Sequence, residues 1–202
     1  FDILTLDATR PVAVKQAVQQ MYSDAASRPD NVLINLGDYE PMSIDDYSLE
    51  LFERLNAVNY LAPVSLLQHL LPAMKVSGGR NIWVNASLAV YRGLPKSAPY
   101  SASKAAVVSL VECLVPEAQQ WGVHLGVINH GFVRTRLTGK NTFEMPMMIE
   151  PEDAASRIIK GMRNKQYEIR FPAMFALWMR LLRIMPHSLY FALTRKMVAN
   201  DV

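Results

Sequence analysis

A tyrosine and a lysine, Tyr100 and Lys104, lie four residues apart in the chain. On a helix this spacing places both side chains on one face. A free tyrosine has a pKa of about 10, which is too high for proton exchange near neutral pH. A neighbouring ammonium group and the positive potential of a helix N-terminus both favour the phenolate and lower this pKa. The pair therefore predicts a general acid/base unit.

Ser87 adds a second hydroxyl to this pair. It lies thirteen residues before Tyr100 and directly follows the apolar run at 81–85 and Ala86. A hydroxyl at the carboxyl end of a strand can meet a tyrosine at the start of the next helix, and the two can hold a carbonyl oxygen between them. A solvated helix pair also has the Tyr-x-x-x-Lys spacing, so Ser87 makes the hypothesis more specific.

The elements that position these residues alternate between strand and helix. We expect strands at 2–6, 31–35, 81–85, 123–128 and 167–170, and helices at 11–26, 48–74, 99–121 and 151–162. Pro63 is expected to kink the helix at 48–74. Apolar strands separated by helices indicate a doubly wound, Rossmann-like α/β fold with a parallel sheet. In such sheets ligands bind beyond the carboxyl ends of the strands, where Ser87 is placed.

Composition limits the class of protein. The chain has 202 residues, half of them apolar, which suffices for one domain or most of a larger one. A net charge of +3 is too small to indicate a nucleic-acid partner. The single cysteine excludes an internal disulfide and favours a reducing, cytoplasmic location. The four histidines lack the spacing of metal ligands, so no metal site is expected.

Three segments in fixed order carry a resemblance to a known family. The segments Val84-Asn85-Ala86-Ser87, Gly93-Leu94-Pro95 and Tyr100-Ser101-Ala102-Ser103-Lys104 resemble short-chain dehydrogenases/reductases of the classical type. The resemblance extends over roughly residues 3–162. It implies an NAD- or NADP-dependent oxidoreductase that interconverts a carbonyl and an alcohol, with the hydride supplied by the nicotinamide.

The resemblance also implies a role for each catalytic residue. Tyr100 would pass a proton to or from the substrate oxygen, and Ser87 would polarise the substrate carbonyl. Lys104 would lower the pKa of Tyr100 and bind the nicotinamide ribose. Asn59, in the segment Val58-Asn59-Tyr60-Leu61, would hold a water that links Lys104 to solvent.

Further segments resemble the parts of the family that contact the cofactor. Leu6-Asp7-Ala8-Thr9 resembles the segment beside the adenine, Ile34-Asn35-Leu36-Gly37 resembles the Asn-Asn-Ala-Gly motif, and 129–135 resembles the segment that contacts the nicotinamide amide. The resemblance thus implies cofactor contacts by Asp7, Ala8, Asn35, Leu36, Gly37, Tyr100, Lys104, Gly131, Val133 and Thr135.

The largest departure from the family is its glycine-rich pyrophosphate turn, which is not found in the sequence. The pair Gly78-Gly79 precedes a strand instead of opening a helix. We therefore expect a domain truncated at its N-terminus by about 50 residues, with two strands missing between 2–6 and 31–35. This predicts a gap in the sheet, with 2–6 displaced or paired directly with 31–35. The alternative function is an inactive scaffold that binds no cofactor.

Two apolar regions have open interpretations. The helices at 48–74 and 99–121 resemble a four-helix subunit contact of the family, which implies a homodimer or homotetramer. The residues concerned either form this contact or face the sheet: Leu66, Leu67, Val107, Val108 and Val111. The loop at 132–150 either covers an apolar substrate as a mobile lid or packs ordinarily, through Phe143, Met145, Met147, Met148 and Ile149.

The chain divides into two parts. Residues 1–170 are expected to form the C-terminal three-quarters of one domain, and 171–202 an amphipathic helical tail rich in arginine. Packing of this tail over the substrate cleft or against another subunit is favoured over peripheral membrane contact through 171–196. No apolar run in the sequence is long enough to span a bilayer.

Overall fold

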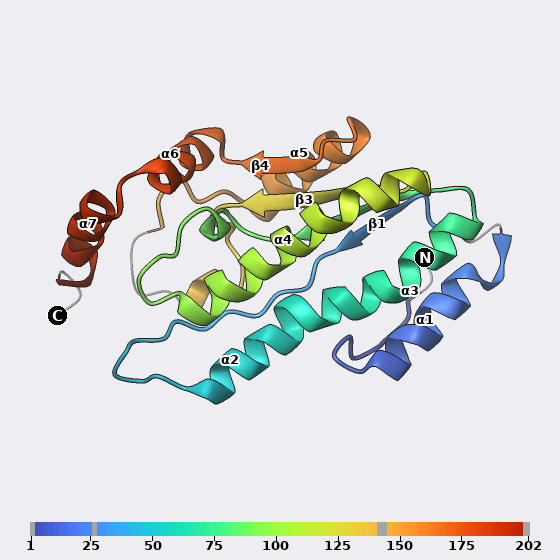
Figure 1. Cartoon of the computed structure of the whole chain (residues 1–202), viewed down its shortest axis with the longest axis horizontal. Coiled ribbons are helices and arrows are strands. Elements are labelled where there is room, and N and C mark those ends of the chain that lie inside the picture. The colour runs from blue at the N-terminus through green and yellow to red at the C-terminus, as the bar shows by residue number, and fades with distance from the viewer. Residues whose placement is uncertain (1–2, 26–27, 141–144, 200–202) are drawn as a thin grey trace.

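A computed structural model describes residues 3–25, 28–140 and 145–199 of the chain. It shows one parallel sheet of four strands flanked by helices (Figure 1). The strands, which neighbour one another in chain order, are β1 (Asn31–Ile34), β2 (Asn81–Asn85), β3 (His124–His130) and β4 (Glu168–Phe171). The doubly wound α/β fold is confirmed, and each of these strands lies within two residues of its expected bounds.

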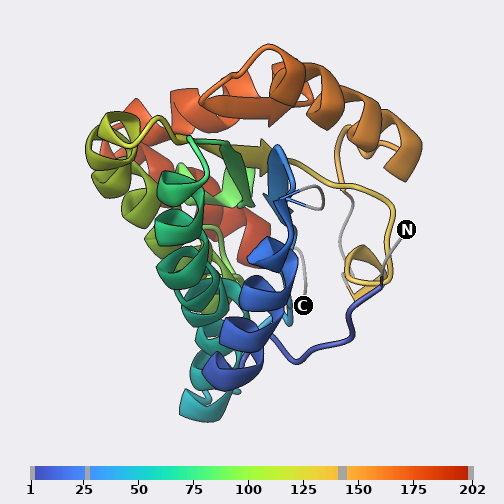
Figure 2. The same cartoon turned by 90° about the vertical axis from the view of Figure 1, so that its right-hand side faces the viewer.

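The helices cover both faces of the sheet. They are α1 (Pro11–Ser23), α2 (Leu49–Asn56), α3 (Ala62–Val76), α4 (Ala98–Gln120), α5 (Pro151–Arg163), α6 (Ala173–Ile184) and α7 (His187–Ala199). Residues of α1, α3 and α4 share one core with the strands, and α5 packs on the opposite face (Figure 2). The apolar strands are therefore buried from both sides, as a parallel sheet requires.

Trp83 on β2 shows how closely α5 and the neighbouring strand enclose the sheet. Its side chain is fully buried, and its indole Nε1 donates to the carbonyl of Gln166 over 2.9 Å. A Cβ on Gly126, in the adjacent strand β3, would come within 2.6 Å of the Trp83 ring. Glycine is thus required at position 126, because the indole occupies the space that any side chain would need.

The segment expected as one helix over 48–74 is divided in the structure. A π-helical turn at Ala57–Leu61 separates α2 from α3. Pro63 lies in the first turn of α3, where its missing N–H costs little. The kink thus precedes the proline, and Asn59 sits inside the widened turn, fully buried.

The expected strand at 2–6 is wrong. Its described part, 3–6, lies outside the sheet, and Ile3 is 87% exposed. The backbone turns at Asp7, whose carbonyl accepts a hydrogen bond from the Arg10 amide. Figure 2 shows this segment running apart from the strands. The expected gap in the sheet is also wrong: β1 to β4 pair without interruption. Of the two placements expected for 2–6, displacement from the sheet is confirmed for its described part, 3–6, and direct pairing with 31–35 is wrong. The truncation itself stays a prediction.

The apolar residues of the long helices face the sheet. Leu67, Val107 and Val111 are buried in the core shared with the strands, and Leu66 and Val108 pack against it. The alternative that these side chains face the sheet is confirmed, whereas the oligomer stays a prediction. In the loop at 132–150, Ile149 packs beside Val133, and Phe143 lies outside the described residues.

Candidate active site

Ser87 and Tyr100 meet at the carboxyl end of β2. Ser87 caps the short 3₁₀ turn Leu88–Val90: its hydroxyl accepts a hydrogen bond from the Ala89 amide over 3.2 Å. Tyr100 lies in the first turn of α4, and the Ser87 side chain is near enough to lower the pKa of its hydroxyl. The predicted pair of hydroxyls is therefore brought together, with Ser87 almost fully buried and Tyr100 half-buried.

Lys104 lies one turn further along α4 and is 1% exposed. Its ammonium donates to the carbonyl of Leu36 at 2.8 Å and to that of Asn85 at 2.9 Å. These carbonyls stand at the carboxyl ends of two adjacent strands, β1 and β2. The buried cation is thus compensated by two backbone dipoles, which fix its position beneath the sheet edge.

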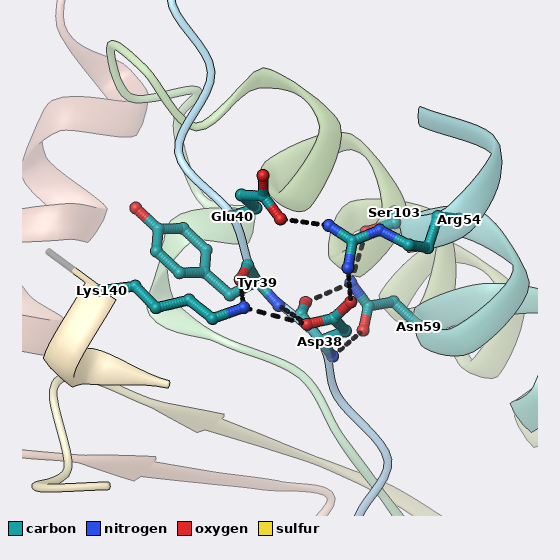
Figure 3. Close-up of polar contacts among 7 residues, drawn as sticks. All are labelled: Asp38, Tyr39, Glu40, Arg54, Asn59, Ser103 and Lys140. Atoms are coloured by element: carbon teal, nitrogen blue, oxygen red, sulfur yellow. Dashed lines mark hydrogen bonds and ion pairs between the residues drawn. The ribbon is translucent and has the colours of Figure 1, made fainter. Parts of the chain in front are cut away.

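Asn59 is held by the segment that follows β1 (Figure 3). Its side-chain oxygen accepts from the Asp38 amide at 2.8 Å, and its nitrogen donates to the Asp38 carbonyl at 2.9 Å. The same nitrogen donates to the Ser103 hydroxyl at 3.0 Å. Asn59 therefore ties α4, the π-turn and the loop after β1 together. The water that the resemblance implies for this residue stays a prediction.

The electrostatics of the pair differ from the expectation. Burial raises the pKa of Tyr100 above its usual 10, and the hydrogen bond with Ser87 offsets part of that rise. The expected lowering of this pKa is not found, because the loss of water around the phenol dominates the shift. Burial also lowers the pKa of Lys104 from 10.5 to about 8.

A loop beyond β1 encloses Tyr100 from one side. The Tyr39 ring meets the Tyr100 ring edge-on, with centroids 5.1 Å apart. Lys140, from the short turn at 138–140, donates to the Tyr39 carbonyl at 2.8 Å and lies 3.6 Å from the Asp38 carboxylate (Figure 3). The same carboxylate pairs with Arg54 at 3.0 Å. Asp38 thus joins α2, the loop after β1 and the loop at 132–150.

These contacts were not visible in the sequence. Asp38 directly follows Gly37 at the end of the predicted strand, which is the one signal that could have drawn attention to it. Ser103 lies inside the Tyr-x-x-x-Lys segment, and nothing in the sequence indicates its contact with Asn59. Tyr39 and Lys140 are 101 residues apart, and nothing in their local sequence indicates that they meet.

The end of β1 carries the next group of predicted cofactor residues. The Asn35 side-chain oxygen accepts from the Asn85 amide group at 2.8 Å, which links β1 to β2 beyond the sheet. Leu36 supplies a carbonyl to Lys104, and Gly37 exposes its backbone next to it. A Cβ on Gly37 would meet the Lys104 Nζ at 3.6 Å, so this backbone lies beside the ammonium.

The residues after β3 border the same edge from the other side. Gly131 donates its amide to the Phe171 carbonyl at 2.8 Å, and a Cβ there would come within 2.8 Å of the Phe175 ring. Val133 pairs with Ile149 through an isolated β-bridge. Thr135 is exposed, and its amide donates to the Thr138 hydroxyl at 2.9 Å.

Asp7 and Ala8 are placed differently from the other predicted site residues. The Asp7 carboxylate accepts hydrogen bonds from the amide and hydroxyl of Thr9, which hold its pKa below the usual range. Ala8 packs against the core at the start of α1. Because 3–6 form no strand, this turn is not delivered to the sheet edge. Within the described ranges, no group of three or more His, Cys, Asp or Glu side chains could hold a metal ion.

Comparison with known proteins agrees with this architecture. The family model described as short chain dehydrogenase matches residues 1–145. An uncharacterized oxidoreductase of Myxococcus xanthus (strain DK1622) is 29% identical over 192 residues, covering 95% of this chain and 76% of that protein. A dehydrogenase/reductase SDR family member 7C-B of Danio rerio is 29% identical over 173 residues, covering 79% of this chain but only 54% of that protein.

Solved structures share the fold at lower identity. A short chain dehydrogenase from Burkholderia cenocepacia J2315 in complex with NADP superposes with a TM-score of 0.82 at 21% identity, covering 94% of this chain and 77% of that one. ElxO with NADP bound gives 0.73 at 18% identity, covering 84% and 76%. The match of the family model over more than half of the sequence shows that the chain belongs to the short chain dehydrogenase family.

Proposed function

We propose that the chain carries the proton-transfer part of an NAD(P)-dependent oxidoreductase that interconverts a carbonyl and an alcohol, with Tyr100 as the general acid/base. One observation carries the proposal: Lys104, one helical turn after Tyr100 on α4, is buried with its ammonium on the carbonyls of Leu36 and Asn85, at the end of β2 that Ser87 follows. The relatives named as oxidoreductases and the neighbours crystallised with NADP support it.

Two hydroxyls can hold a substrate oxygen at this site. Ser87 and Tyr100 would each donate to the carbonyl oxygen, which polarises the carbon toward reduction. Tyr100 would then transfer its proton to the oxygen as the alcohol forms. Its raised pKa suits this direction, because the protonated phenol predominates at neutral pH. In the reverse direction, the phenolate would accept the proton of the alcohol.

Lys104 provides the positive charge that this transfer requires. As Tyr100 loses its proton, the nearby ammonium would stabilise the developing phenolate. The carbonyls of Leu36 and Asn85 keep the ammonium in place, so little reorganisation is needed during proton transfer. Asn59 acts as a positioning residue, since it clamps the Asp38 backbone against α4.

The sheet edge has features that fit a nicotinamide cofactor. Gly37 exposes its backbone beside Lys104, so a ribose could approach the ammonium there. The residues that would hold the cofactor are Asn35, Leu36, Gly37, Tyr100 and Lys104 with Gly131, Val133 and Thr135 beyond β3. When bound, the cofactor supplies the hydride. Asp7 and Ala8 would join this set only if their turn approached the sheet edge, and both NAD and NADP fall within the proposal.

The finer features of the function are proposals as well. Met145 and Met148 in the loop at 132–150 are partly buried, which favours a small apolar substrate. A homodimer or homotetramer in a reducing, cytoplasmic compartment agrees with the family and with the single cysteine.

Activity of the native protein with and without the Tyr100 hydroxyl tests the proposal. NADH and NADPH oxidation is followed with a panel of apolar aldehydes and ketones. Tyr100→Phe is expected to lower kcat about 10³-fold. Tyr47→Phe, which alters an exposed tyrosine, is the matched control. Equal activity of Tyr100→Phe and the native protein would contradict the assignment.

An inactive scaffold is the second candidate function, because the glycine-rich pyrophosphate turn is not found in the sequence. The same titration separates the two functions. A folded native protein that binds neither NADH nor NADPH and turns over no carbonyl would establish the scaffold. Binding of either cofactor with a defined Kd would exclude it.

A further inference from the structure

We propose that the tail helices α6 and α7 dock on a membrane surface that contains anionic lipid. The contact is made by a face of α6 formed by Met174, Leu177, Trp178, Leu181 and Ile184, which we call the α6 face. These residues follow the spacing i, i+3, i+4, i+7 and i+10, so they project on one side of the helix. Each is at least half exposed, and Ile184 is 77% exposed.

The α6 face is not the side by which the helix packs on its own protein. Ala176 and Met179 are buried on the opposite side, in a cluster with Leu88. Tyr91 and Leu94 pack against the same cluster. The helix is therefore apolar on two sides, and packing of the described chain explains only one of them. A contiguous exposed apolar face of this kind marks an interaction surface.

The charge of the tail selects the partner. Between Glu168 and Asp201 the sequence contains no acidic residue, and its basic residues are Arg170, Arg180, Arg183, Arg195 and Lys196. Arg180 and Arg183 on α6 line a pocket with Glu112 and Glu168. Arg195 and Lys196 are exposed on α7, so they carry the charge that can meet a membrane. Anionic lipid headgroups complement this charge. A symmetric contact with a second copy would bring the same basic residues together and is disfavoured by their repulsion.

The helices are suited to lie in the plane of a membrane. Their lengths of 12 and 13 residues are too short to cross it, and no helix in the described part of the chain could do so. On α7, Leu189 and Leu193, four residues apart, are exposed on one side of the helix. Trp178 is an aromatic residue of the kind that favours the headgroup region. Figure 1 shows both helices at the end of the molecule toward which β3 and β4 point.

The tail helices also touch the segments that carry the site. Phe175 of α6 stacks on Phe132 with ring centroids 5.6 Å apart, just after Gly131. The Tyr190 hydroxyl of α7 donates to the carbonyl of Gly93, in the loop between Ser87 and Tyr100. Docking would thus bring the substrate side of the site to the bilayer and favour substrates dissolved in lipid. This consequence rests on the proposed function, whereas membrane binding does not.

Vesicle sedimentation tests the surface directly. One vesicle contains phosphatidylcholine alone, and the other includes about 30 mol% phosphatidylglycerol. The chain is expected to sediment with the anionic vesicle about tenfold more strongly than with the neutral one, and added salt should weaken this binding. The double variant Trp178→Glu/Leu181→Glu should lose about tenfold or more of the binding, since it places charges on the apolar face.

A matched double variant separates the α6 face from general apolarity. Ile44→Glu/Val76→Glu alters two residues that are each 86% exposed on other parts of the surface, and it should bind as the unaltered chain does. Circular dichroism checks that both variants are folded. Absence of sedimentation with either vesicle, or an equal loss in both double variants, overturns the proposal. So does a dimer that the α6 variant dissociates without any vesicle binding, because a second copy then covers the face.

The depth of Trp178 gives an independent readout. Brominated phosphatidylcholine mixed into the anionic vesicle should quench the tryptophan fluorescence of the chain. Trp178→Phe should still sediment but lose this quenching, since Trp83 is fully buried and Trp121 lies just before β3, at the end of the sheet opposite to the tail helices. Unchanged quenching in Trp178→Phe would overturn the assignment of the face. Tyr100→Phe should bind vesicles normally, so failure of the catalytic proposal and failure of this one give different results.

Discussion

Polar side chains usually lie at the surface of a protein and apolar ones in its interior. The site around Lys104 and the α6 face depart from this rule in opposite directions. Lys104 and Asn59 are polar groups in the interior, whereas Leu177 and Trp178 are apolar groups at the surface. The interior groups are compensated within the chain, by carbonyls for Lys104 and by the Asp38 backbone for Asn59. The α6 face has no such compensation among the described residues. The buried polar groups would serve a reaction within the chain, whereas the exposed apolar α6 face requires an external partner.

Replacing the buried cation should have the largest effect. Lys104→Met keeps the length of the side chain but removes the charge that would stabilise the Tyr100 phenolate. We expect kcat of the native protein to fall about 10³-fold. Lys160→Met, on the exposed side of α5, should retain full activity. A Lys104→Met enzyme with near-normal kcat would show that the buried ammonium has only a structural role.

Removing the clamp at Asn59 should lower the stability of the fold. Asn59→Ala leaves the Asp38 amide and carbonyl without their side-chain partners in a buried setting. The free energy of unfolding should fall by about 2 kcal/mol. Urea denaturation measures this loss. Asn31→Ala removes one exposed hydrogen bond, from Asn81, and should cost at most about 0.5 kcal/mol. Equal losses in the two variants would remove the distinction between the buried and exposed amides.

The lowered pKa of Lys104 predicts a pH dependence. The ammonium is lost as pH rises through about 8, so the rate of carbonyl reduction should fall about tenfold from its plateau by pH 9. This fall in rate cannot come from unfolding that is caused by the titration of Lys104. The unfolded chain keeps this proton up to about 10.5, so the contribution of Lys104 to stability rises between pH 8 and 10.5. A kcat profile that stays flat to pH 10 would disprove the link.

Much of the site was predictable because local sequence determines it. Apolar runs define β2 and β3, and parallel strands bring their carboxyl ends to one edge, which places Ser87 near Tyr100 and Lys104. Spacing on a helix does the same for Tyr100 and Lys104. The positions of Gly131 and Gly37 follow from the strands that they terminate.

What could not be predicted depends on distant partners. The apolar pattern at 2–6 indicates a strand but cannot supply the neighbour that a strand needs, and 3–6 lie outside the sheet. The direction of the Tyr100 pKa shift depends on how much water the fold removes, which spacing does not reveal. The contacts of Lys140 with Asp38 and Tyr39 join segments about a hundred residues apart.

The two sides of α6 contrast buried and exposed apolar residues on one helix, and the exposed side gives the smallest expected effect. Met179→Ala should lower the free energy of unfolding by about 3 kcal/mol, since its side chain is almost fully buried. Leu177→Ala, two positions earlier and half exposed, should change it by less than about 0.5 kcal/mol in dilute solution without lipid. Thermal denaturation at several protein concentrations measures both. A large, concentration-dependent loss for Leu177→Ala would mean that another copy of the chain covers the α6 face, and the surface would then serve assembly instead of a membrane.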